Sequence, residues 1–234
     1  MSLEVSVHDA QTSILRELLF RPTAGYAELQ KPTGLEGDHF NFHLTQLVKK
    51  GLVEKTARGR YQLSTLGKEY ANKLDTDSNT IERQPKVSVI LVVWQDERRQ
   101  SLLMQERLKN PYFGFWGYPT GKMRWGETIV EAAARELLEE TGLTAAFTVH
   151  GIYHEHAYKH DSSDLLEDKL FLITSTTKTS GTLLDGEGCR NRWVTINEAK
   201  QFEKRFPGHD TVKAIINHEY LFVERDAHYS PEQF

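Results

Sequence analysis

The stretch that most constrains the fold of this chain runs from Gly121 to Leu143, GKMRWGETIVEAAARELLEETGL. Residues 128–141 are rich in Ala, Leu and Glu and contain no Gly or Pro. Such a composition favours a helix, and Gly142 is well placed to end it in a left-handed conformation. The stretch therefore predicts a loop followed by a helix.

The predicted helix gathers carboxylates on one side. At about 100° per residue, Glu136, Glu139 and Glu140 share one face, and their mutual repulsion opposes the helix by about 0.2–0.5 kcal/mol per pair. Only Arg135 is close enough in sequence to compensate. The opposite, packing face is predicted to hold Val130, Ala134, Leu137 and Leu138.

Three clustered carboxylates suit a hard divalent ion, Mg²⁺ or Mn²⁺, which takes oxygen ligands and leaves places for water and phosphates. This favours metal-assisted phosphate chemistry. The alternative is a solvated acidic surface helix, but that alternative gives no reason for the Gly-to-Glu spacing of the preceding loop.

The spacing of these residues resembles the signature of the Nudix hydrolases, G-x5-E-x7-R-E-U-x-E-E-x-G-U, where U is a bulky aliphatic residue. A chance match is on the order of 10⁻⁷ from average residue frequencies. The matching positions are Gly121, Glu127, Arg135, Glu136, Leu137, Glu139, Glu140, Gly142 and Leu143.

The resemblance implies roles for these residues. Glu136, Glu139 and Glu140 are expected to ligate the metal together with the carbonyl of Thr120. Arg135 and Glu127 would form a pair that holds the loop against the helix, and Glu127 would also reach the metal through water. Mg²⁺-activated water, deprotonated by a glutamate, would then attack a diphosphate.

Many Nudix relatives use one more carboxylate from a later loop, as ligand or base. Here Glu187, shortly before Trp193 and Val194, is the expected residue. Glu167 and Asp168 are substitutes, and a plain surface glutamate is the alternative.

Residues near the Nudix signature of Gly121–Leu143, called the box from here on, are candidates to bind substrate. Phe115, Trp116 and Tyr118 either form pocket walls that stack on a base or fill the core. Three basic residues are candidates to meet substrate phosphates: Arg107, Lys122 and Arg124. Tyr158 lies in a region where some dinucleoside polyphosphate hydrolases have a tyrosine.

The substrate class implied is a nucleoside diphosphate linked to another moiety. Nucleoside triphosphates, dinucleotides, ADP-ribose and nucleotide sugars all remain candidates. A rival hypothesis is a transcriptional regulator whose Nudix domain senses a nucleotide metabolite without cutting it, although the intact box favours catalysis.

The length of 234 residues and the hydrophobic content of 38% favour two domains. We predict a small domain over 1–75, a linker over 76–85 and a Nudix domain over 86–234. The Nudix resemblance implies an α/β/α sandwich with a mixed sheet, in which 87–94 is a buried strand and 101–107 its neighbour. Two closing helices are predicted over 197–206 and 210–222.

The first domain shows helical patterns around 14–19, 26–30 and 36–50, then two strands joined at Arg58 and Gly59, then a helix over 65–74. The third helix is predicted to pack through Phe40, Leu44, Leu47 and Val48. The run from His39 to Tyr70 resembles the winged helix-turn-helix domains of bacterial regulators.

On this resemblance the helix over 36–50 enters a major groove and the wing contacts phosphates. The residues concerned are His39, Asn41, His43 and Gln46 in the helix and Lys55, Arg58 and Arg60 in the wing. Ten Lys and Arg against nine Asp and Glu in residues 1–75 give a net charge of about +1, so DNA binding would require a homodimer. The alternative is a role in assembly or in covering the catalytic domain.

The chain carries one cysteine, Cys189, and no long apolar run or signal peptide, which favours a reducing, cytoplasmic setting without a membrane partner. Cys189 has no local base pattern, so no nucleophilic role is predicted. His154 and His156 would share a strand face, with His160 nearby; a strand lining the pocket is favoured over a Zn²⁺ or proton-transfer site.

Overall fold

The computed structural model describes residues 8–56, 59–75, 80–81 and 83–234. The chain divides into two compact units, Met1–Arg83 and Gln84–Phe234. Arg58, expected in the wing, lies outside the described residues. Within the part of the chain that is described, no helix is long and apolar enough to cross a membrane.

The first unit is a set of helices around a small antiparallel sheet with the strand order β1-β3-β2. Its apolar core includes Ile14, Leu15, Phe40 and Leu44, whereas Val48, expected on the packing face, is 38% exposed. The elements are α1 (Asp9–Phe20), β1 (Ala24–Gly25), α2 (Tyr26–Gln30), η1 (Lys31–Thr33), α3 (Gly37–Lys49), β2 (Val53–Lys55), β3 (Arg60–Leu63) and α4 (Thr65–Ala71).

The end of this unit differs from the prediction. The last helix ends at Ala71 instead of Leu74, and β4 (Leu74–Asp75) pairs with β5 (Thr80–Ile81). The segment expected to be a linker therefore contains a strand. The winged-helix assignment stays a prediction.

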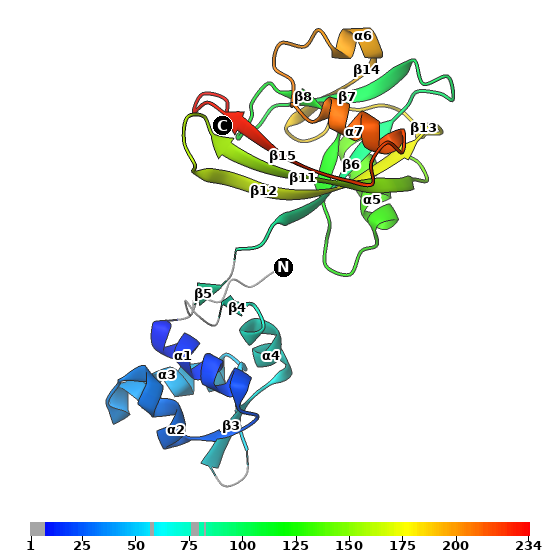
Figure 1. Cartoon of the computed structure of the whole chain (residues 1–234). Helices are drawn as coiled ribbons and strands as arrows, with labels where there is room; N and C mark the ends of the chain where they lie inside the picture. Colours follow the sequence, from blue (N-terminus) through cyan, green and yellow to red (C-terminus); the bar gives the residue numbers. More distant parts are fainter. Residues whose placement is uncertain (1–7, 57–58, 76–79, 82) are drawn as a thin grey trace. The chain divides into compact units, whose positions relative to one another are not determined.

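The second unit is built on a five-stranded mixed sheet with the order β15-β11-β12-β6-β9 (Figure 1). Strand β6 lies parallel to β12 and antiparallel to β9, and β11 lies antiparallel to β12 and parallel to β15. The predicted mixed α/β fold is confirmed. The strands are β6 (Lys86–Val93), β9 (Thr120–Lys122), β11 (Thr148–Lys159), β12 (Leu165–Thr176) and β15 (Phe222–Tyr229).

A second, antiparallel sheet has the order β14-β7-β8, formed by β14 (Cys189–Thr195), β7 (Ser101–Arg107) and β8 (Trp116–Gly117). The prediction that 101–107 pairs beside 87–94 is wrong, apart from one bridge between Trp94 and Leu102. The cause is packing, because Leu102 and Met104 bury themselves with Val194 in a separate apolar cluster. A short pair of strands, β10 (Leu143–Thr144) and β13 (Ser180–Gly181), completes the unit's strands.

Helix α5 (Ile129–Thr141) is the predicted box helix. Thr128 caps its first turn, and Gly142 ends it at φ 72°. Its buried face was predicted correctly at Leu137 but not at Val130 and Leu138, which are 43% and 51% exposed. The face of the helix that packs holds Ala132, Ala133 and Leu137. It lies against the β6 residues Val89, Leu91 and Val93.

Helix α7 (His209–Ile216) packs on the other face of the sheet, against the alternate β6 residues Ile90 and Val92, so the sheet lies between α5 and α7 (Figure 1). The predicted closing helices are much shorter, because α6 covers only Ile196–Ala199 and α7 ends at Ile216. The final strand β15 was missed. Its sequence FVERDAHY is charged on its exposed positions and does not stand out as a strand before its partner β11 is known.

Candidate active site

Arg135 joins the box loop, the box helix and strand β9. Its guanidinium forms a bidentate pair with Glu127, donates to Glu136 Oε1 at 2.7 Å and to Glu139 Oε2 at 3.0 Å, and donates to the carbonyl of Lys122 at 3.0 Å. The Arg135 side chain is only 15% exposed. Arg135 lowers the pKa of Glu127 to about 2, and the acidic partners raise the pKa of Arg135.

Glu136 lies directly over the backbone of Gly121. A Cβ added at Gly121 would lie 1.8 Å from Cδ of Glu136, so only glycine permits this approach. The Glu136 side chain is 12% exposed, and burial raises its pKa although Arg135 opposes the rise. A carboxylate in this position is stabilised by positive charge.

The other two box glutamates differ in environment. Glu139 is 45% exposed and accepts hydrogen bonds from Arg124 at 3.0 and 3.1 Å as well as from Arg135. Glu140 Oε2 accepts a hydrogen bond from Cys189 Sγ at 3.0 Å. Burial, followed by this contact, raises the pKa of Cys189 to about 12, so the thiol is a hydrogen-bond donor.

These residues fit a divalent ion in their chemistry. The donors are carboxylate oxygens, Glu136 is held half-buried over bare backbone, and Arg135 is shared among three carboxylates. The three glutamates do not yet bring their carboxylate oxygens together. Within the described residues, ligand atoms that all lie within 4.8 Å of one another are found instead on His154, His156 and Asp168. Glu139 instead forms ion pairs with Arg124 and Arg135.

A cavity of about 510 Å³ opens beside the box helix, and Glu136 and Glu140 contribute to its wall. Its other walls come from β6, β7, β9, β11, β12 and α7 and from the loop that follows β7. Basic residues line it, namely Lys86, Arg107, Lys109, Lys122 and Lys169, together with rings and apolar groups that include Tyr112, Tyr118, Tyr153, Phe171, Phe206 and His209. This volume lies within the usual range for small-ligand sites, about 300–1,000 Å³.

Besides Glu136 and Glu140, four more residues predicted to serve this site line the cavity: Thr120, Lys122, Arg107 and Tyr118. The Arg107 side chain donates to the carbonyls of Pro111 and Asn110 and so braces the loop at the cavity edge.

Three predicted substrate residues lie elsewhere. Trp116 stacks on Phe202, with ring centroids 4.2 Å apart, and fills the cluster under the second sheet. Tyr158 stacks on His228 on the sheet face opposite Tyr153, which lines the cavity. Arg124 pairs with Glu139 and is 60% exposed.

The structure separates the candidates that the sequence offers for an additional carboxylate. Glu187 is exposed in the loop before β14 and is absent from the described cavity lining, whereas its substitute Glu167 is buried in that lining. Asp168, next along β12, points to the opposite face. Although burial alone would raise the pKa of Glu167, ion pairs with Lys169 and Lys86 lower it.

Several cavity residues were missed by sequence reasoning. Glu155 alternates with His154 and His156 on β11, and burial raises the pKa of Glu155. Lys86 of β6 and Lys169 of β12 lie opposite each other in the strand register. His209, on the helix thought to be without chemistry, has its ring 4.5 Å from that of Tyr118, and burial lowers its pKa to about 4. The alternation of β11 and β12 was the available signal.

The residues predicted for DNA contact are only partly exposed. His39, Asn41, Lys55 and Arg60 are exposed, but Arg60 also pairs with Glu28 and donates to Thr23. The expectation that α3 exposes its whole polar side to a DNA groove therefore does not hold at His43 and Gln46. The ring of His43 is half-buried against the ring of His8 at 4.5 Å, and Gln46 is half-buried as well.

Residues 84–214 match the NUDIX domain, and because this is more than half of the chain, the chain belongs to the Nudix family. The predicted membership is confirmed. The chain is 33% identical over 87 residues to the ADP-ribose pyrophosphatase of Methanocaldococcus jannaschii, which is 36% of this chain and 50% of that protein. It is 40% identical over 62 residues to phosphatase NudJ of Escherichia coli, 26% of this chain and 38% of NudJ.

The chain thus spans about half or less of the length of these curated relatives. Among solved structures, the NUDIX domain of Shewanella oneidensis NrtR, determined with ADP ribose, has a TM-score of 0.50 at 13% identity. The match covers 68% of this chain and 100% of that one. At this identity the likeness shows a shared fold.

Proposed function

We propose that the second unit is a divalent-metal-dependent pyrophosphohydrolase that cleaves the diphosphate of a nucleoside diphosphate linked to another moiety. The observation that carries the proposal is the joint opening of Glu136 and Glu140 into a cavity lined by lysines, an arginine and aromatic rings. The carboxylates of the box helix suit a cation, and the basic and aromatic residues suit phosphates and a base. An acidic surface helix would require no such cavity.

Glu136, Glu139 and Glu140 would hold the metal, with the carbonyl of Thr120 beside them. When bound, a divalent ion supplies positive charge that offsets the charge of the diphosphate and makes water a better nucleophile. Mg²⁺ or Mn²⁺ matches the oxygen donors best.

The chain's own residues orient the reaction. Arg135 fixes the angle of the helix to the loop through Glu127, which keeps Glu136 over Gly121. Lys122 lies beside them in the cavity wall and is suited to a substrate phosphate. A glutamate would take the proton of the attacking water, and the candidates are Glu140 and Glu167 in the cavity lining and Glu139 on the box helix.

The aromatic residues of the cavity are suited to stack on a base. The rings of Tyr118 and His209 lie 4.5 Å apart, and Phe206 lines the same cavity. At neutral pH His209 is uncharged, because burial lowers its pKa to about 4. An uncharged aromatic wall is suited to stack on a base.

The test is a Mg²⁺- or Mn²⁺-dependent product screen over nucleoside triphosphates, dinucleoside polyphosphates, nucleotide sugars and ADP-ribose. ADP-ribose is included because one relative is an ADP-ribose pyrophosphatase. On the best substrate, Glu139→Gln and Glu140→Gln should each lower turnover by about 10²–10⁴-fold.

The matched control is Glu97→Gln, since Glu97 is 72% exposed and forms a surface ion pair with Lys178. It should leave turnover unchanged. Near wild-type turnover of both box variants, with circular dichroism unchanged, would refute the proposal.

A separate hypothesis gives the first unit a role in DNA binding. It rests on the exposed His39 and Asn41 of α3 and on the exposed Lys55 and Arg60 of the neighbouring strands. An electrophoretic shift with DNA upstream of the gene, at low salt and with or without nucleotide, tests it. Absence of a shift at low salt would remove this hypothesis, because phosphate contacts are strongest there.

A further inference from the structure

A second cluster of ligand-type side chains lies on the sheet face that turns away from the cavity. His154 and His156 alternate along β11 with the cavity residues Tyr153 and Glu155. Because side chains of a strand point alternately to its two faces, both histidines lie on the opposite side. Asp168 on β12 is the direct cross-strand partner of His156.

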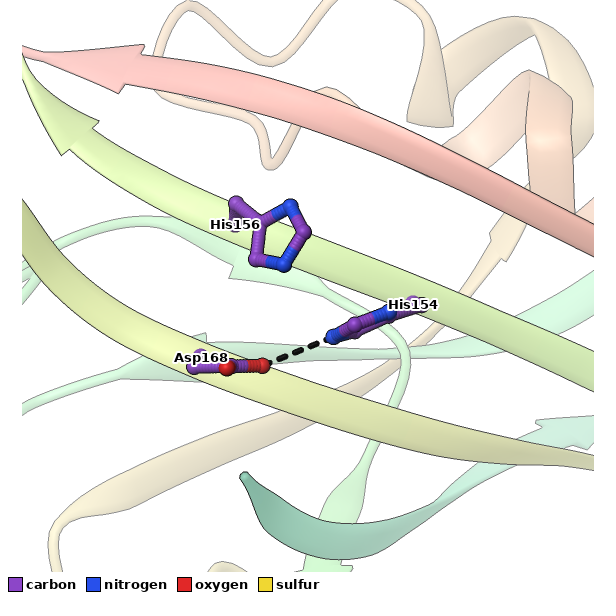
Figure 2. Close-up of side chains that lie close together, drawn as sticks. All are labelled: His154, His156 and Asp168. Atoms are coloured by element: carbon purple, nitrogen blue, oxygen red, sulfur yellow. Dashed lines mark hydrogen bonds and ion pairs between the residues drawn. The ribbon is translucent and has the colours of Figure 1, made fainter. Parts of the chain in front are cut away.

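The three side chains are close enough to share one ion. One ligand atom from each of His154, His156 and Asp168 lies within 4.8 Å of the other two, and Figure 2 shows them gathered over neighbouring strands. His154 Nε2 is 2.7 Å from Asp168 Oδ1. Ligand atoms around a tetrahedral Zn²⁺ with bonds of about 2.0–2.1 Å are roughly 3.3 Å apart, so small side-chain movements suffice.

The other nitrogen of each ring is already occupied by a carboxylate. His154 Nδ1 lies 2.8 Å from Glu224 Oε1, and His156 Nδ1 lies 3.3 Å from Asp226 Oδ1. Both carboxylates stand on β15, directly opposite their histidines in the parallel register. A carboxylate on one ring nitrogen fixes the tautomer and turns the other nitrogen outward as a ligand, which is the usual support of a metal-bound histidine.

A plain ion-pair explanation accounts for only part of this arrangement. A protonated His154 between Asp168 and Glu224 needs neither His156 nor Asp226. Yet the ring of His156 lies 4.3 Å from that of His154 and has a carboxylate of its own. Two histidines, each oriented by a separate acid and both next to a third acid, match a metal site better than a single charged imidazole.

We propose that His154, His156 and Asp168 bind a divalent transition-metal ion, with Zn²⁺ the best-matched ion, and that Glu224 and Asp226 orient the two rings. Two nitrogens and one oxygen suit Zn²⁺, whereas the all-oxygen donors of the box helix suit Mg²⁺ or Mn²⁺. The side chains of His154, His156 and Asp168 are 15%, 27% and 29% exposed, so the ion would be reached from solvent and could keep a water ligand.

Such an ion would join β11 directly to β12 and, through the two orienting carboxylates, to β15. The reverse faces of β11 and β12 carry the cavity residues Glu155, Glu167 and Lys169. The metal therefore acts as a clamp on the strand pair that forms one cavity wall. This inference does not depend on the proposed hydrolase activity.

The test is calorimetric titration of the full chain with Zn²⁺ in the presence of excess Mg²⁺, which occupies oxygen-only sites. Co²⁺ titration in parallel reports coordination through visible absorption. We expect one equivalent bound in the wild type, with Co²⁺ giving the intense bands of a four-coordinate site. His156→Gln and Asp168→Asn should each weaken binding by at least about tenfold, and Asp226→Asn by about 10–100-fold as an orienting group.

His160→Gln is the matched control, since His160 follows the same strand but is 59% exposed and pairs with the adjacent Asp161. It should bind like the wild type. Zn²⁺ should also raise the unfolding temperature of the wild type and the control but not that of His156→Gln. Absence of Zn²⁺ uptake by the wild type, or unchanged uptake by His156→Gln and Asp168→Asn with native circular dichroism, would overturn the proposal.

Discussion

Replacing Arg135 with methionine tests how the box loop and helix are held together. Methionine preserves most of the buried aliphatic stem but removes the guanidinium that serves Glu127, Glu136 and Glu139. Glu127 and Glu136 are 18% and 12% exposed, so two half-buried carboxylates would lose their counter-charge. Breaking a fully buried pair on one side costs about 3–5 kcal/mol, and the access of water to these groups reduces the expected cost to about 2 kcal/mol.

For a domain of this size a loss of about 2 kcal/mol lowers the unfolding temperature by roughly 4–8 °C. Tryptophan fluorescence is the assay, because all four tryptophans lie in the second unit and report on it alone. Arg190→Met is the control. Arg190 forms a single pair with Glu106 and is 59% exposed, so its loss should cost less than about 1 kcal/mol.

A double-mutant cycle then separates the pair from general damage. Combining Arg135→Met with Glu127→Gln removes the stranded carboxylate as well, so the double variant should be more stable than the sum of the single effects by about 1–3 kcal/mol. Excess Mg²⁺ should stabilise Arg135→Met more than the wild type, since a cation replaces part of the lost charge. Strict additivity, or an unfolding temperature of Arg135→Met equal to that of the wild type, would refute the reasoning.

Three further predictions concern single positions. Gly121→Ala should lower turnover by about 10²-fold with native circular dichroism, because its Cβ would meet Glu136 Cδ at 1.8 Å and a shift of ~1 Å at a catalytic group has that effect. Cys189, 4% exposed, should resist iodoacetamide in the folded protein and react fully in denaturant, as mass spectrometry would show; rapid native labelling would contradict its burial. His209 has a folded pKa of about 4 against 6.5 unfolded, so the unfolded state binds more protons between these values. Stability should be full above about pH 6.5 and fall by about 3 kcal/mol toward pH 4, and urea titrations should show a flatter profile for His209→Gln.

The box helix could be predicted because its information is local. Helix formers bounded by Thr128 and Gly142 define the element, and the spacing of Glu136 and Glu140 places both carboxylates on one side. Its packing face could not be predicted as well. Ala132 and Ala133 have small side chains that permit close approach to β6, and their burial depends on a partner that is distant in sequence.

The cavity could be predicted mainly in the segment adjoining the box, with Arg107 and the substitute carboxylate Glu167 as the exceptions. Tyr118 and Lys122 lie within it, but Trp116 turns toward Phe202, which comes from a loop far along the chain. Likewise the sequence FVERDAHY of β15 has weak strand character by itself. Its pairing with β11 is a tertiary effect that propensity does not contain.

The alternation of β11 explains why the two candidate metal sites of the second unit can coexist without competing. Glu155 faces the cavity with the oxygen-rich site, and its neighbours His154 and His156 face away with the nitrogen-containing site. Because a shift of one residue in register would exchange the two faces, the register that places Glu155 in the cavity also builds the histidine cluster. An insertion in β11 should therefore abolish Zn²⁺ uptake and substrate cleavage together, whereas His156→Gln should abolish only the uptake. Loss of cleavage in His156→Gln at saturating Mg²⁺ would instead mean that the clamp is required to keep the cavity wall in place.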